Sequence, residues 1–142
     1  MKTKFTQALI GGIAATLVMT MVMFIGPFMG LPKMNPAAML SMMMGVPVFM
    51  GWGLHFMTGI IFALVYVYLF VPLLKKVNSR VLKGIIFGFA VFVFAQIMIA
   101  VMSALFGGMA SPEESMLLML IGSVFGHLIY GIVVALFVQN AK

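Results

Sequence analysis

Four long apolar stretches dominate the sequence and limit what the chain can fold into. They cover about 8–29, 47–70, 81–106 and 111–138. A helix needs roughly 20 mostly apolar residues to cross the hydrocarbon core of a bilayer. Hydrophobic residues make up 65% of the chain and charged residues 7%, which is far from the composition of soluble domains. We therefore predict an all-α integral membrane protein with four transmembrane helices.

The segments between these stretches carry signals that start and stop helices. Gly26-Pro27 is expected to bend or end the first helix. Asn35-Pro36 predicts a short helix to about 44, since Asn accepts hydrogen bonds from first-turn amides and Pro suits the first helical position. The Ser-Pro-Glu-Glu segment at 111–114 predicts the start of the fourth long helix, where the two acids suit the positive end of the helix dipole.

The basic residues are distributed unevenly between the two ends of the predicted helices. Lys33 alone belongs to one end. The other basic residues share the opposite end: Lys2, Lys4, Lys75, Lys76, Arg80, Lys83 and Lys142. Because basic residues accumulate in cytoplasmic segments, both termini are expected to be cytoplasmic. The net charge of +6 is assigned to this orientation and not to nucleic acid, whose binding proteins gather Lys and Arg on a solvated face.

One pattern occurs twice in the sequence, 72 residues apart. The stretches GWGLHFMTGIIFAL (51–64) and SVFGHLIYGIVVAL (123–136) share His, Gly, Ile, Ala and Leu at the same positions. A spacing of four places residues on one face of a helix, so each copy forms a stripe of small residues around one His. The stripes consist of Gly51, His55, Gly59 and Ala63 in the first copy and Ser123, His127, Gly131 and Ala135 in the second.

The first and third long helices carry a second pattern with the same offset. Gly12 and Thr16 stand 72 residues before Gly84 and Gly88. Small residues at this spacing allow helices to approach closely in lipid, so these positions are predicted to pack helices together. We therefore predict a single membrane domain, 1–142, built from two similar tandem hairpins at about 5–72 and 78–139. Copies with equal orientation would be related by a pseudo-twofold axis along the membrane normal.

The two histidines are the candidates for chemistry, and three interpretations are open. In the first, each imidazole is structural and bonds to a neighbouring helix. Its available partners are Gln96, Tyr130, Thr16, Thr20 and Thr58. In the second, His55 and His127 are the axial ligands of one b-type haem, with their small neighbours leaving room for the macrocycle. In the third, the 17 Met residues handle Cu(I), which thioethers suit, although Met also fills apolar interfaces generically.

Catalytic motifs are missing from the sequence. The two acidic residues of the chain, Glu113 and Glu114, are explained by capping of the fourth helix, and no nucleophile with its base, phosphate loop or hydrolytic metal motif is present. The chain has no Cys, which excludes thiolate metal sites and covalently attached haem. We expect no enzyme activity, no catalytic residue, no protein metal site and, apart from the haem alternative, no cofactor.

The segment Gly126-His127-Leu-Ile-Tyr130-Gly131 resembles the closing signature of a family of small, uncharacterised bacterial four-span membrane proteins. The first copy departs from it, because Thr58 stands where Tyr130 stands in the second. The resemblance implies a multi-pass protein of the bacterial cytoplasmic membrane without established catalytic residues.

These observations favour a protein that interacts with other proteins in the membrane. The predicted helices leave little of the chain outside the bilayer and offer more apolar surface than one small bundle buries. We expect an accessory subunit of a larger membrane assembly, for which a respiratory complex is one candidate, with the lipid bilayer and other membrane subunits as its partners. The leading alternative is a bis-His haem b electron carrier, and copper handling ranks below it.

Overall fold

The computed structural model describes residues 3–106 and 115–138 of the chain. Every regular element within these two ranges is helical, and none is a strand. Four segments are long and apolar enough to cross a membrane: Lys4–Met29, Val48–Leu73, Arg80–Leu105 and Met116–Phe137. The prediction of an all-helical chain with four long apolar helices is therefore confirmed for the described residues.

The helices follow one another with short connections. Their bounds are α1 Lys4–Ile25, the 3₁₀ turn η1 Gly26–Met29, α2 Pro36–Met44, α3 Val48–Val65, the π-helical turn η2 Tyr66–Phe70, α4 Val71–Leu73, α5 Arg80–Phe106 and α6 Met116–Phe137. The first helix starts earlier than predicted, because Thr3 caps it by accepting a hydrogen bond from the Thr6 amide. The predicted helix start at 111–114 lies outside the described residues, which resume at Ser115, just before α6.

The short helix α2 is set by its terminal residues. The Asn35 side chain accepts a hydrogen bond from the Ala38 amide at 3.0 Å, and Pro36 occupies the first helical position. Gly45 ends the helix with φ of 63°, a left-handed conformation that side chains rarely adopt. The short helix predicted from Asn35-Pro36 is therefore confirmed, with both ends fixed by local chemistry.

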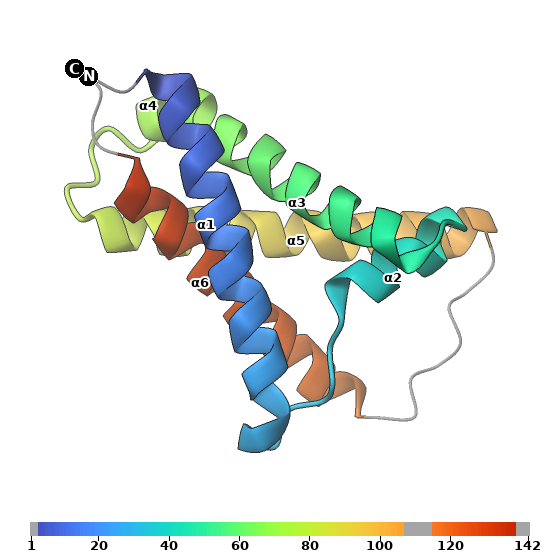
Figure 1. The fold of residues 1–142 in the computed structure, drawn as a ribbon. Helices are drawn as coiled ribbons and strands as arrows, with labels where there is room; N and C mark the ends of the chain where they lie inside the picture. Colours follow the sequence, from blue (N-terminus) through green and yellow to red (C-terminus); the bar gives the residue numbers. More distant parts are fainter. Residues whose placement is uncertain (1–2, 107–114, 139–142) are drawn as a thin grey trace.

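The four long helices share one end and spread apart toward the other (Figure 1). The shared end contains the start of α1, the α4 region, the start of α5 and the end of α6. From there α1 and α6 extend together, while α3 and α5 extend in a different direction. The short helix α2 follows η1 in the chain and packs against α3, at the end of α3 that is distant from the shared end. The core is therefore concentrated toward the shared end.

A group of aromatic side chains fills the core between η2, α5 and α6. The Phe87 ring of α5 lies 4.9 Å from Tyr66, 4.9 Å from Phe70 and 6.3 Å from Tyr130, measured between ring centroids. Such tilted and edge-on aromatic pairs are favourable beyond their buried area. Phe87 is only 1% exposed, so it links η2, α5 and α6 within the core.

The outer surface of the long helices is apolar as well. Large hydrophobic side chains that are more than 40% exposed occur on all four of them, for example Leu17, Met57, Phe94 and Leu136. In water such a surface would be an extended hydrophobic patch, whereas hydrocarbon solvates it without cost. The exterior thus suits lipid, in agreement with the lengths of the four helices.

Candidate functional site

The contact between α1 and α3 is built from the small residues of both helices. A Cβ on Gly12 would lie 2.9 Å from Ile60 Cα and 3.0 Å from the Gly59 carbonyl oxygen. A Cβ on Gly59 would collide with the Thr16 hydroxyl, and Ala63 is fully buried against Gly12. The two backbones therefore touch directly, which only the absence of side chains permits.

The contact between α5 and α6 repeats this arrangement. A Cβ on Gly84 would lie 2.5 Å from Ile132 Cα and 2.8 Å from the Gly131 carbonyl oxygen. A Cβ on Gly131 would collide with the Gly84 carbonyl oxygen and lie 2.7 Å from Gly88 Cα. Ala135, one turn further along α6, is buried as Ala63 is in α3. Each of these contacts has a partner in the first pair, displaced by 72 residues.

The two contacts differ where Thr16 replaces Gly88. The Thr16 hydroxyl donates to the Gly12 carbonyl oxygen at 2.7 Å and so satisfies its polar group within α1. At Gly88 the α6 backbone comes closer, because an added Cβ would collide with the His127 carbonyl oxygen and lie 2.9 Å from Leu128 Cα. The second pair is therefore the tighter one.

The predicted stripes do not contact a single neighbour along their whole length. Gly51 faces α2, since a Cβ there would collide with the Ala37 carbonyl oxygen and lie 3.0 Å from Ser41 Cβ. Its counterpart Ser123 accepts a hydrogen bond from Gln96 of α5 at 3.5 Å. The outer ends of the two stripes thus have different environments, because α2 has no equivalent in the second half of the described chain.

His55 is buried and bonded to α1. Its Nε2 lies 3.0 Å from the Thr20 hydroxyl, which itself donates to the Thr16 carbonyl oxygen at 2.7 Å. A hydroxyl has only one proton, so His55 Nε2 carries the hydrogen and donates to Thr20. The ring also contacts Trp52 and Phe56 edge-on, at 6.2 and 5.9 Å. Thr20 was one of several partners available from sequence, and the structure selects it.

His127 is half-buried and bonded within its own helix. Its Nδ1 lies 2.7 Å from the Ser123 carbonyl oxygen, and since a carbonyl can only accept, Nδ1 carries the hydrogen. In His127 the lone pair is therefore on Nε2, whereas in His55 Nε2 carries the hydrogen. The ring packs edge-on against Phe92 of α5, with centroids 6.0 Å apart. Phe92 stands 72 residues after Thr20, so each His faces the partner helix of its own pair at the equivalent position.

Tyr130 joins the two helix pairs. Its hydroxyl donates to the Gly59 carbonyl oxygen at 2.5 Å, and the residue is 3% exposed. This bond connects the second half of the described chain to the first, whereas His55 and Gln96 bond within their own halves. Thr58, the counterpart of Tyr130, is too short to make an equivalent bond. The two halves are therefore connected asymmetrically, through α6 onto α3.

Sequence reasoning missed the glycine contacts between α1 and α6. A Cβ on Gly126 would lie 2.7 Å from Met23 Cε and 3.5 Å from Met19 Cε, and one on Gly11 would lie 3.1 Å from Phe137 Cβ. The four-residue spacing of Gly122 and Gly126 was a visible signal in the sequence. Met19 and Met23, two of the 17 Met residues considered for Cu(I), fill the space over Gly126.

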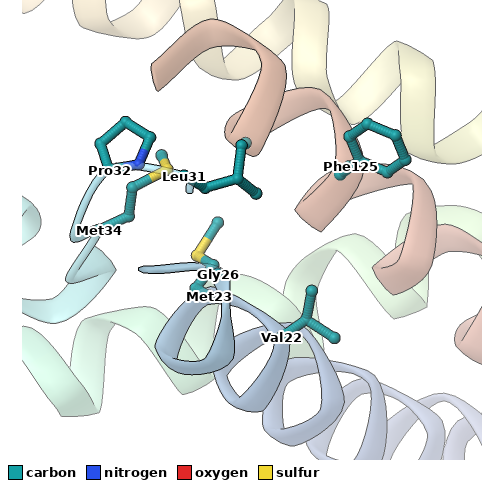
Figure 2. Close-up of a pocket in the computed structure, with 8 residues that line it drawn as sticks. Val22, Met23, Gly26, Leu31, Pro32, Met34 and Phe125 are labelled. Carbon is teal, nitrogen blue, oxygen red and sulfur yellow. The ribbon is translucent and has the colours of Figure 1, made fainter. Parts of the chain in front are cut away.

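A small cavity lies between the end of α1, the segment that follows it and the start of α6 (Figure 2). Its volume is about 20 Å³, and it is lined by Val22, Met23, Gly26, Leu31, Pro32, Met34, Gly122 and Phe125. The space is about large enough for one water molecule. Every lining residue is apolar, so the cavity offers no side-chain hydrogen-bond partner that would hold a water there. Neither His lines this cavity.

The described geometry defines a class of protein: an all-helical chain whose four apolar helices can cross a membrane and pack through small residues. No group of three or more His, Cys, Asp or Glu in its described part has the arrangement of a metal site. The chain belongs to a family of unknown function, DUF6789, whose model matches residues 2–142. This agrees with the expectation of an uncharacterised family. No curated protein and no solved structure matches the chain.

Proposed function

We propose that the chain is a non-catalytic multi-pass membrane protein that acts as an accessory subunit of a larger membrane assembly, with a respiratory complex as one candidate. The observation that carries the proposal is Gly53. Apart from its chain neighbours and the nearby backbone of its own helix, no atom of the described residues lies within 4 Å of where its Cβ would be, although it stands inside the long helix α3. Gly30 and Gly45 also have open space, but both have positive φ values, which explain them. Gly53 has no such backbone reason.

Gly53 lies in an outward apolar row of α3. Phe49, Met57 and Ile61 share its face at four-residue spacing and are 74%, 50% and 48% exposed. A glycine between large side chains forms a notch, into which a second helix can fit its backbone. Lipid tails gain nothing from such a notch, and glycine weakens a helix. The face therefore suits a transmembrane helix of another subunit.

Purification in mild detergent tests this proposal. Full-length tagged protein should bring down a partner in near-equal amount, and Gly53→Leu should lose that partner because its side chain fills the notch. Val93→Leu, an enlargement on the exposed surface of α5, is the matched control and should retain the partner. A wild-type protein that purifies as a stable lone monomer would contradict the proposal, as would a Gly53→Leu variant that keeps its partner.

The proposal includes a duplicated architecture and an orientation. The matched contacts at an offset of 72 residues support two tandem hairpins within a single domain of residues 1–142, at about 5–72 and 78–139. The described basic residues other than Lys33 gather at the shared end of the helices, which supports a cytoplasmic location for that end and for both termini. The resemblance noted in the last helix supports the bacterial cytoplasmic membrane as the location.

Cysteine labelling tests the orientation directly. The chain has no native Cys, so each label reports only the introduced residue. Ser79→Cys and Ser111→Cys should react with an impermeant thiol reagent from opposite sides of the membrane. Labelling of both from the same side would refute the four-span arrangement.

A haem-binding electron carrier is the second candidate function, and His127 favours it. Its Nδ1–H donates to a backbone carbonyl and leaves Nε2 free, which is the arrangement that orients a metal-binding imidazole. His55 fits less well, because its Nε2 is bonded to Thr20 and its ring faces α1. The residues thus fit a pair of haem ligands only in part, and the structural role of both His is the better supported one.

An absorption spectrum separates the two candidates. Protein from haem-replete cells should be colourless if the histidines are structural. A reducible Soret and α-band that disappears in both His55→Ala and His127→Ala would instead establish the carrier and refute the structural role of the pair.

A further inference from the structure

Cations gather around the start of α5. Lys75 and Lys76 precede the helix and are exposed, Arg80 is its first residue and Lys83 stands one turn further. The first turn contains no acidic residue. A helix carries partial positive charge at its N-terminus, so cations there repel it. We call these four residues the basic cluster, and an external anion near the start of α5 would offset the repulsion among them.

Lys83 differs from an ordinary surface lysine. It is 9% exposed and shares the face of α5 that carries the core residue Phe87, one turn nearer the shared end. No hydrogen bond or ion pair joins its ammonium group to any residue of the described part of the chain. The residue is buried through its alkyl stem, whereas its ammonium group is not among the buried atoms without a partner, so this cation is available to an anion at the mouth of the bundle.

The protein has no carboxylate side chain among its described residues to fill this role. Its two acidic side chains, Glu113 and Glu114, come shortly before α6 in the sequence. The described start of α6 lies at the opposite end of the long helices from the start of α5 (Figure 1). The length of α5, 27 residues, corresponds to roughly 40 Å. The described residues therefore provide no counter-charge for the basic cluster.

We propose that the basic cluster binds the phosphate of an anionic phospholipid from the membrane leaflet at the shared end. The inference rests on the membrane placement in the proposed function. A lipid phosphate sits at the depth where a transmembrane helix begins, and Ser79 caps α5 by accepting from the Leu82 amide at 3.2 Å, which fixes that start. Arg80 supplies a planar donor pair suited to phosphate, and Lys83 reaches outward along its alkyl stem.

Lipid titration followed by native mass spectrometry tests the proposal on the full chain. Phosphatidylglycerol should bind more tightly than phosphatidylcholine, and Arg80→Gln should weaken phosphatidylglycerol binding about fivefold, the effect of one basic residue near an anionic surface. Lys83→Met should act similarly. Arg80 is exposed, so its variant tests the site even if Lys83→Met fails to fold. Lys33→Gln, at the other end of the helices, is the matched control and should bind as the wild type does.

Two results would overturn the lipid assignment. One is equal phosphatidylglycerol binding by the wild type and Arg80→Gln. The other is full displacement of the lipid by millimolar inorganic phosphate, which would make free phosphate the ligand. Flotation with phosphatidylcholine vesicles checks membrane insertion separately, so failure of the lipid site and failure of the membrane placement give different outcomes.

Discussion

The tight contact between α5 and α6 predicts a graded series of glycine substitutions. In Gly84→Ala the new methyl group would lie 2.5 Å from Ile132 Cα and 2.8 Å from the Gly131 carbonyl oxygen. Both obstacles are backbone atoms, which cannot rotate away as the end of a side chain can. Carbon atoms prefer to be about 3.5–4.0 Å apart, so the two helices must separate by about 1 Å.

The expected cost follows from this geometry. Overpacking of a well-packed contact costs about 1–3 kcal/mol, and we expect Gly84→Ala to lower the free energy of unfolding by about 2 kcal/mol. Gly12→Ala, the equivalent change in the contact between α1 and α3, meets its nearest atom at 2.9 Å and should cost about 1 kcal/mol. Gly53→Ala meets nothing within 4 Å and should be neutral or slightly stabilising, because alanine favours the helix.

Reversible unfolding in bicelles, followed by steric trapping or by titration with a denaturing detergent, measures this series. All three substitutions add one methyl group to a helical glycine, so differences in helix propensity cancel between them. The order of destabilisation should be Gly84→Ala, then Gly12→Ala, then Gly53→Ala. If Gly84→Ala were as stable as Gly53→Ala, the direct backbone contact between α5 and α6 would be refuted.

Two further predictions concern the polar bonds of the core. Tyr130→Phe removes the donor to the Gly59 carbonyl oxygen and should lower the free energy of unfolding by about 1 kcal/mol, whereas the exposed Tyr68→Phe should not; equal effects would contradict a bond between the two halves. A double-mutant cycle of His55→Ala and Thr20→Val should give a coupling near 0.6 kcal/mol in the same assay, and additive effects would argue against their bond.

Local chemistry alone determined much of this fold. The length and hydropathy of the apolar stretches were sufficient to predict four helices that can cross a membrane. Asn35-Pro36 and Gly45 set the ends of α2 through first-turn hydrogen bonds and backbone conformation, neither of which depends on distant residues. The common spacing of small residues around His55 and His127 was also visible, because it requires only a comparison of the two stretches.

Tertiary structure decided which neighbour each side chain meets. Periodicity places residues on one face of a helix, but the crossing of the helices determines what that face contacts. The first stripe is therefore divided, with Gly51 against α2 and Gly59 against α1. The same holds for His55, which bonds to Thr20, and for Tyr130, which reaches the Gly59 carbonyl oxygen across the molecule. The sequence determined the helices and their small faces, whereas the rotation and crossing of the packed helices chose the partners, because those depend on all contacts at once.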